Sequence, residues 1–126
     1  MASDKKILVV EDIDIMKNLI ERYLQALGYD QIVLAKNGED ALIILKREKI
    51  DLIISDWMMP NMDGLTLLKE IRSDEALKDI PFFMATIMDQ KEKIAQAEKA
   101  GATDYLVKPI DRTALGLKIK KVFAQN

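Results

Sequence analysis

Five side chains that could support phosphoryl chemistry stand directly after short apolar runs of this 126-residue sequence. They are three carboxylates, one hydroxyl and one ammonium: Glu11, Asp12, Asp56, Thr86 and Lys108. Carboxylates that lie close together repel one another, and a hard divalent cation such as Mg²⁺ relieves that repulsion and readily shares its site with a phosphate. If the fold brings these groups together, we expect a magnesium and phosphoryl site. Asp56 is the expected nucleophile, because carboxylates can form acyl phosphates.

Two absent residue types narrow the chemistry further. The sequence has no Cys, which excludes disulfides and thiolate chemistry, and no His, which excludes Ser-His-Asp catalysis and His-ligated metals. Lys and Arg number 19 against 21 Asp and Glu, so no basic excess is available to neutralise nucleic-acid phosphates. No apolar run is long enough for membrane insertion, and the N-terminus does not resemble a signal peptide. A cytoplasmic protein is therefore expected.

Five apolar runs must position the reactive side chains, and each is followed by a segment of helical period. The runs cover residues 7–10, 32–34, 52–54, 81–85 and 105–107. Apolar runs without polar alternation indicate strands buried on both faces, hence a parallel sheet covered by helices. The sequence predicts an α/β fold: a three-layer, doubly wound (βα)5 flavodoxin-like domain with five parallel strands in the order 2-1-3-4-5. Asp14 is expected to cap the first helix.

The reactive side chains all follow strands, and binding sites in such sheets lie beyond the carboxyl ends of the strands. Strands one, three, four and five deliver the five groups to one place, whereas strand two ends in Lys36 and Asn37. Each residue alone has an ordinary explanation as a helix cap, turn residue or surface charge. Their joint occurrence at four strand ends is what favours a functional site.

Four stretches of the sequence resemble the receiver domain of two-component response regulators. They are ILVVED at 7–12, ISDWMMPNMDG at 54–64, FMAT at 83–86 and GATDYLVKP at 101–109. Together they span nearly the whole chain, and residues 55–65 are most similar to the single-domain chemotaxis type. The resemblance implies one receiver domain over residues 1–126, with no output domain. It also implies a protein that catalyses only its own phosphorylation and dephosphorylation.

The resemblance assigns roles at the expected site. Asp56 would accept a phosphoryl group from the phosphohistidine of a sensor histidine kinase. Mg²⁺ would be held by Asp12, Asp56 and the backbone carbonyl of Met58, with Glu11 acting through water. Lys108 would pair with the phosphoryl group, and the bond that follows it, to a proline, is cis in the family.

The resemblance also implies a switch that a partner reads. Thr86 would shift toward the phosphoryl group and Tyr105 would turn inward with it, which changes the surface of the fourth helix, fifth strand and fifth helix. The residues expected on that surface are Lys91, Ile94, Tyr105 and Lys118. The implied partners are the kinase and a protein target that recognises the phosphorylated state, in chemotaxis or motility signalling. A monomer is expected, with a weak dimer as the alternative.

The sequence departs from the family pattern around the site. Ile87 stands where the family prefers a small residue, and the flanking positions Ile13, Met58 and Met88 are all apolar. We hypothesise that this apolar rim disfavours the water that hydrolyses the acyl phosphate, which would make self-dephosphorylation slow. Asp14 replaces a family-typical Ser or Thr and adds negative charge near the metal.

Three other classes of protein share features with this sequence. Aspartyl-phosphate phosphatases need a second Asp two residues after the nucleophile, but Met58 stands there. A flavin or dinucleotide carrier needs a loop rich in Gly or Ser after the first strand, and that loop is acidic here. An interaction module that keeps the receiver fold without phosphorylation stays open as the alternative.

Overall fold

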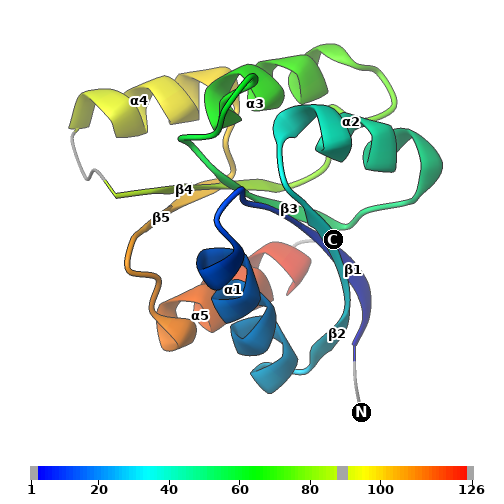
Figure 1. The fold of residues 1–126 in the computed structure, drawn as a ribbon, viewed down its shortest axis with the longest axis vertical. Coiled ribbons are helices and arrows are strands. Elements are labelled where there is room, and N and C mark those ends of the chain that lie inside the picture. Colours follow the sequence, from blue (N-terminus) through cyan, green and yellow to red (C-terminus); the bar gives the residue numbers. More distant parts are fainter. Residues whose placement is uncertain (1–2, 88–90, 125–126) are drawn as a thin grey trace.

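The chain folds into a parallel sheet with helices on both of its faces, and the computed structural model describes residues 3–87 and 91–124 (Figure 1). The elements alternate along this described part of the chain: β1 Ser3–Val10, α1 Asp14–Ala26, β2 Tyr29–Ala35, α2 Gly38–Arg47, β3 Leu52–Asp56, α3 Gly64–Ser73, β4 Phe82–Thr86, α4 Lys91–Ala100, β5 Asp104–Val107 and α5 Arg112–Ala124. The strand order is β2-β1-β3-β4-β5, which confirms the predicted topology. None of the helices in these two ranges is long and apolar enough to cross a bilayer.

The core has two halves, one on each face of the sheet. Side chains of β1 alternate between them: Leu8 and Val10 pack with α2, α3 and α4, whereas Ile7 and Val9 pack with α1 and α5. Figure 1 shows this division, with α1 and α5 on one side of the sheet and the other three helices on the opposite side. Burial on both faces explains why the strands lack polar alternation.

At the start of the chain two strands are longer than their apolar runs, and one expectation needs correction. β1 and β2 both begin earlier than their apolar runs, because β1 is already paired with β2 at Ser3, where the backbone hydrogen bonds rather than buried side chains extend the strand. Asp14 does not cap α1: Ile13 occupies the cap position without a side-chain hydrogen bond, and Asp14 is the first helical residue. The Asp14 carboxylate lies 3.3 Å from the Lys17 ammonium instead.

The start of α3 fixes the helix against the end of β3. Asp63 caps the helix, since its Oδ1 accepts a 2.8 Å hydrogen bond from the backbone N–H of Thr66. The N–H of Gly64 donates to the carbonyl oxygen of Trp57 at 2.8 Å. A Cβ at position 64 would collide with the carbonyl oxygen of Asp56 and lie 3.0 Å from the Trp57 Cα. Only glycine allows the helix and the strand end to approach this closely.

Replacing Gly64 by alanine should therefore destabilise the fold. The added methyl group meets backbone atoms, which cannot move aside as a flexible side chain can, so we expect a loss of about 1–3 kcal/mol in unfolding free energy. Urea unfolding measures this value. Thr66→Ala, an exposed change on the same helix, is the control and should stay within about 0.5 kcal/mol of the wild type. A Gly64→Ala variant as stable as this control would contradict the close approach.

Candidate functional site

The register of the sheet brings the predicted site residues to one edge. Val10 pairs with Ser55, so Glu11 and Asp56 come next on neighbouring strands. Asp56 pairs with Ala85 on the other side, and Thr86 follows as the last residue of β4. Thr86 pairs with Val107, and Lys108 follows at the end of β5. The parallel pairing therefore aligns the carboxyl ends of four strands and places their reactive side chains together, as the sequence predicted.

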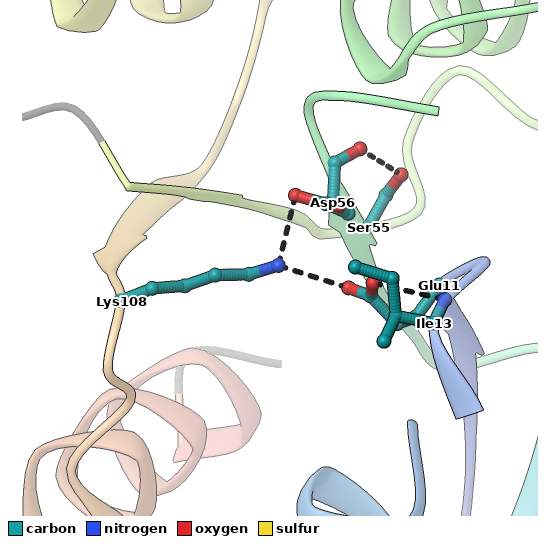
Figure 2. A network of polar contacts seen from close by, with 5 residues as sticks. All are labelled: Glu11, Ile13, Ser55, Asp56 and Lys108. Atoms are coloured by element: carbon teal, nitrogen blue, oxygen red, sulfur yellow. Dashed lines mark hydrogen bonds and ion pairs between the residues drawn. The ribbon is translucent and has the colours of Figure 1, made fainter. Parts of the chain in front are cut away.

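Lys108 connects the two sides of this site. Its Nζ lies 3.0 Å from Oε2 of Glu11 and 3.1 Å from Oδ1 of Asp56 (Figure 2). The backbone supports this position, because the Lys108 N–H donates to the carbonyl oxygen of Thr86 at 2.8 Å, and the Lys108–Pro109 bond is cis. One ammonium is thus shared between two carboxylates, one that directly follows β1 and one at the end of β3.

Burial makes these charges sensitive to one another. Glu11 is fully buried and Asp56 is only 6% exposed. Burial raises the pKa of Glu11 above its ordinary value, and the charge of Asp56 raises it further, while the hydrogen bond from Lys108 opposes both. Burial by itself lowers the pKa of Lys108, but the hydrogen bond to Glu11 and the charge of Asp56 outweigh it, so that pKa is raised. Lys108 is therefore held in its charged form.

A group of three carboxylates could hold a cation here. Glu11, Asp12 and Asp56 each offer one oxygen, and these oxygens all lie within 4.8 Å of one another. Oxygens bound to one Mg²⁺ stand about 2.9 Å apart when adjacent and about 4.2 Å apart when opposite, so these carboxylates would have to draw together to hold the ion. Both oxygens of Glu11 are already engaged, Oε1 with the N–H of Ile13 at 3.3 Å and Oε2 with Lys108. This engagement favours the expected indirect role of Glu11.

The remaining predicted site residues lie at or just beyond the ends of β1, β3 and β4. Thr86 is buried at the end of β4. Three side chains of the expected apolar rim reach solvent: Ile13 is 51%, Met58 62% and Ile87 70% exposed. The fourth, Met88, lies outside the described residues. The metal role of the Met58 carbonyl stays a prediction.

Three residues beside Asp56 were not singled out from the sequence. The Ser55 hydroxyl donates to the carbonyl oxygen of Asp56 at 3.0 Å, and Gly64 lies against the same carbonyl group. Trp57 is buried next to them. The loop motif ending in Gly64 was the available signal for a close approach. No spacing rule marks a buried serine or tryptophan as part of a site.

The expected partner surface lies along one edge of the sheet. β5 is an edge strand, flanked by α4 and α5 (Figure 1). Tyr105 is half-buried there, and the Lys118 Nζ lies 5.5 Å from its ring centroid and 2.9 Å from Oδ1 of Asp104. Lys91 is exposed and Ile94 is half-buried on α4. The structure thus places the four predicted residues on the three expected elements.

Comparison with known proteins agrees with this geometry. Residues 7–120 match the family model described as the response regulator receiver domain. The chain is 40% identical over 118 residues to the chemotaxis protein CheY-3 of Vibrio cholerae, covering 94% of this chain and 91% of the relative. It is 38% identical over 118 residues to the chemotaxis protein CheY of Pseudomonas aeruginosa, covering 94% and 95%.

The solved structures lead to the same fold. The structure of the Vibrio cholerae chemotaxis protein CheY4 superposes with a TM-score of 0.88 at 32% identity. The superposition covers 95% of this chain and 99% of that one. The topology is therefore that of a known group of signalling domains.

Replacing Asp12 by asparagine should distinguish the effect of charge repulsion on stability from the effect of metal binding. Asp12→Asn removes one of three clustered negative charges, so without metal the unfolding free energy should rise, by at most about 1 kcal/mol because Asp12 is exposed and water screens it. Mg²⁺ at 100 times its dissociation constant should stabilise the wild type by about 2.7 kcal/mol and the variant far less. Thermal unfolding with and without Mg²⁺ measures both effects.

The control for this experiment is Asp14→Asn, which removes a nearby surface charge that pairs with Lys17. It should keep the full stabilisation by Mg²⁺. Equal Mg²⁺ effects in wild type and Asp12→Asn would show that Asp12 is not a ligand.

Proposed function

Because the chain belongs to the response regulator receiver domain family, we propose that it is a phosphorylation-controlled signalling protein whose phosphoacceptor is Asp56. The observation that carries the proposal is the Lys108 ammonium, shared at 3.0 and 3.1 Å between Glu11 and Asp56 beside a third carboxylate. This cluster contains a carboxylate that could act as nucleophile, an ammonium that could pair with a phosphoryl oxygen, and carboxylate oxygens that could bind a hard cation.

The proposed reaction moves one phosphoryl group. A carboxylate oxygen of Asp56 forms a bond to phosphorus, while the phosphorus–nitrogen bond of the donor phosphohistidine breaks and its electron pair returns to the imidazole, which takes up a proton. Bound Mg²⁺, held by Asp12, Asp56 and the Met58 carbonyl, would neutralise charge on the phosphoryl oxygens. The Lys108 ammonium is within hydrogen-bonding distance of Asp56 and would orient the group.

These 126 residues contain no histidine, so the donor histidine lies outside them. The proposal therefore includes a sensor histidine kinase as one partner. A second partner would recognise the phosphorylated state on the surface that contains Lys91, Ile94, Tyr105 and Lys118. A hollow of about 240 Å³ lined in part by Tyr105, Ile110 and Lys118 gives this surface a shape that a partner side chain could fill.

Chemotaxis is the proposed process. Two curated relatives, from Vibrio cholerae and Pseudomonas aeruginosa, bear the name of chemotaxis proteins and match this chain over nearly their whole length. The proposal takes residues 1–126 as one receiver domain that acts on a separate protein.

The exposed apolar rim supports a slow loss of the phosphoryl group. Ile13, Met58 and Ile87 come from three different strand-to-helix connections around Asp56. Hydrolysis of the acyl phosphate needs a water molecule next to phosphorus, and apolar side chains do not hold such a water by hydrogen bonds. This rim would lengthen the lifetime of the phosphorylated state.

Acetyl phosphate with Mg²⁺ tests the phosphoacceptor directly. The wild type should gain the mass of one phosphoryl group in intact mass spectrometry, and Asp56→Asn should gain none. Asp30→Asn, on the exposed part of β2, is the matched control and should load like the wild type. A mass gain that survives Asp56→Asn would exclude this acceptor, and no gain in the wild type would favour the non-phosphorylated interaction module.

Opening the rim should shorten the life of the phosphorylated protein. For the double variant Ile87→Ala with Met58→Asn, we expect hydrolysis faster by about tenfold, which corresponds to about 1.4 kcal/mol in the barrier. The decay is followed by phosphate release after the donor is removed. Leu117→Ala, an equally exposed apolar residue on α5, should leave the rate unchanged. An unchanged rate in the double variant would contradict the role of the rim.

A further inference from the structure

Trp57 links the phosphoacceptor to the rest of the fold. It is the single tryptophan of the sequence, follows Asp56 directly and is only 4% exposed. The backbone N–H of Trp57 donates to the carbonyl oxygen of Ala85 at 2.9 Å, and the backbone carbonyl oxygen of Trp57 accepts from the N–H of Gly64 at 2.8 Å. The main chain at Trp57 is thus held between β4 and the start of α3. Because Trp57 follows Asp56 directly, a shift of the Asp56 backbone would act on the position of the indole ring.

The indole ring is also in contact with α4. The Lys93 Nζ lies 5.2 Å from its ring centroid. An ammonium at this distance is attracted by the negative face of the ring, and indole is the strongest aromatic partner. Among the described residues, Lys93 forms no ion pair that would compete with the ring. The contact joins the residue after Asp56 to the first turn of α4.

This contact matters because the rest of α4 is lightly anchored. Ala97 is the buried side chain of this helix, and it belongs to the same core cluster as Trp57. The first four residues of α4 contain no buried side chain, since Lys91 and Glu92 are exposed and Lys93 and Ile94 are half-buried. Segments with few buried apolar contacts open and shift at low free-energy cost. A single cation–π contact can therefore influence where this end of the helix lies.

We propose that Lys93 is a positioning residue that couples occupation of the Asp56 site to the first turn of α4 through the Trp57 ring. The inference rests on the proposed function, because it takes Asp56 as the phosphoacceptor, and it adds the route by which α4 responds. Coupling between two sites is reciprocal in binding free energy. A partner that binds the exposed face of α4 and moves Lys93 would therefore also change the affinity of the Asp56 site.

Hydrogen exchange of the α4 amides tests the coupling. The site is filled with Mg²⁺ and beryllofluoride, a stable mimic of a phosphoryl group on the Asp56 carboxylate, and exchange at residues 91–97 is compared with the empty protein. Filling should change exchange in the wild type by about fivefold or more, the lower end of typical coupling. Lys93→Met keeps the aliphatic stem and removes the charge, so this response should be largely lost at an unchanged melting temperature.

Two further variants separate the ring contact from a general effect of charge. Lys93→Arg keeps a cation that can stack on the indole and should restore the response. Lys99→Met removes an exposed charge near the other end of the same helix and should respond like the wild type.

The outcomes also separate this inference from the proposed function. Calorimetry reports whether Mg²⁺ and beryllofluoride bind, and Asp56→Asn should abolish their joint binding. Binding with an equal α4 response in wild type and Lys93→Met overturns the coupling and leaves the phosphoacceptor in place. A wild type that binds without any α4 response also overturns the coupling. A wild type that does not bind contradicts both proposals.

Discussion

The carboxyl end of the sheet depends on the two ion pairs that the buried ammonium of Lys108 forms with Glu11 and Asp56. The carboxylates of Glu11 and Asp56 are buried away from water, and they would repel each other if the ammonium were absent. The compensation is incomplete, because three carboxylates and one ammonium leave two negative charges. One divalent cation carries the charge that balances them. A cation bound among these carboxylates would therefore change the electrostatics of the whole strand edge.

Much of this arrangement could be predicted from the sequence, because burial on both faces leaves a distinct mark. The apolar runs around Ile7, Ile53 and Phe83 have no polar alternation, which indicates a parallel sheet and therefore one common edge for the strand ends. Once that edge is known, Asp56 and Lys108 have to meet there, although they are 52 positions apart in the sequence.

The helix cap and the contacts between elements depend on distances in the folded protein, which the hydrophobic periodicity of the sequence does not encode. Asp14 was expected to cap α1, yet the backbone places Ile13 at that position. The pairing of Glu11 with Lys108, the approach of Gly64 to β3 and the contact of Lys93 with Trp57 are all set by how strands and helices pack. A helical pattern identifies the side of α4 that faces the core. It does not say which residue of another element lies opposite a given lysine.

The pairing of Glu11 with Lys108 spans 97 positions of the chain, and this separation has a consequence for biosynthesis. The ribosome makes Glu11 and Asp56 before it makes Lys108. At about 5–20 residues per second, translation from Asp56 to Lys108 takes about 3–10 seconds. During that interval the emerging polypeptide contains Glu11 and Asp56 but neither the Lys108 ammonium nor the edge strand β5. The ion pairs that join the ends of β1, β3 and β5 therefore cannot form until residue 108 has been synthesised.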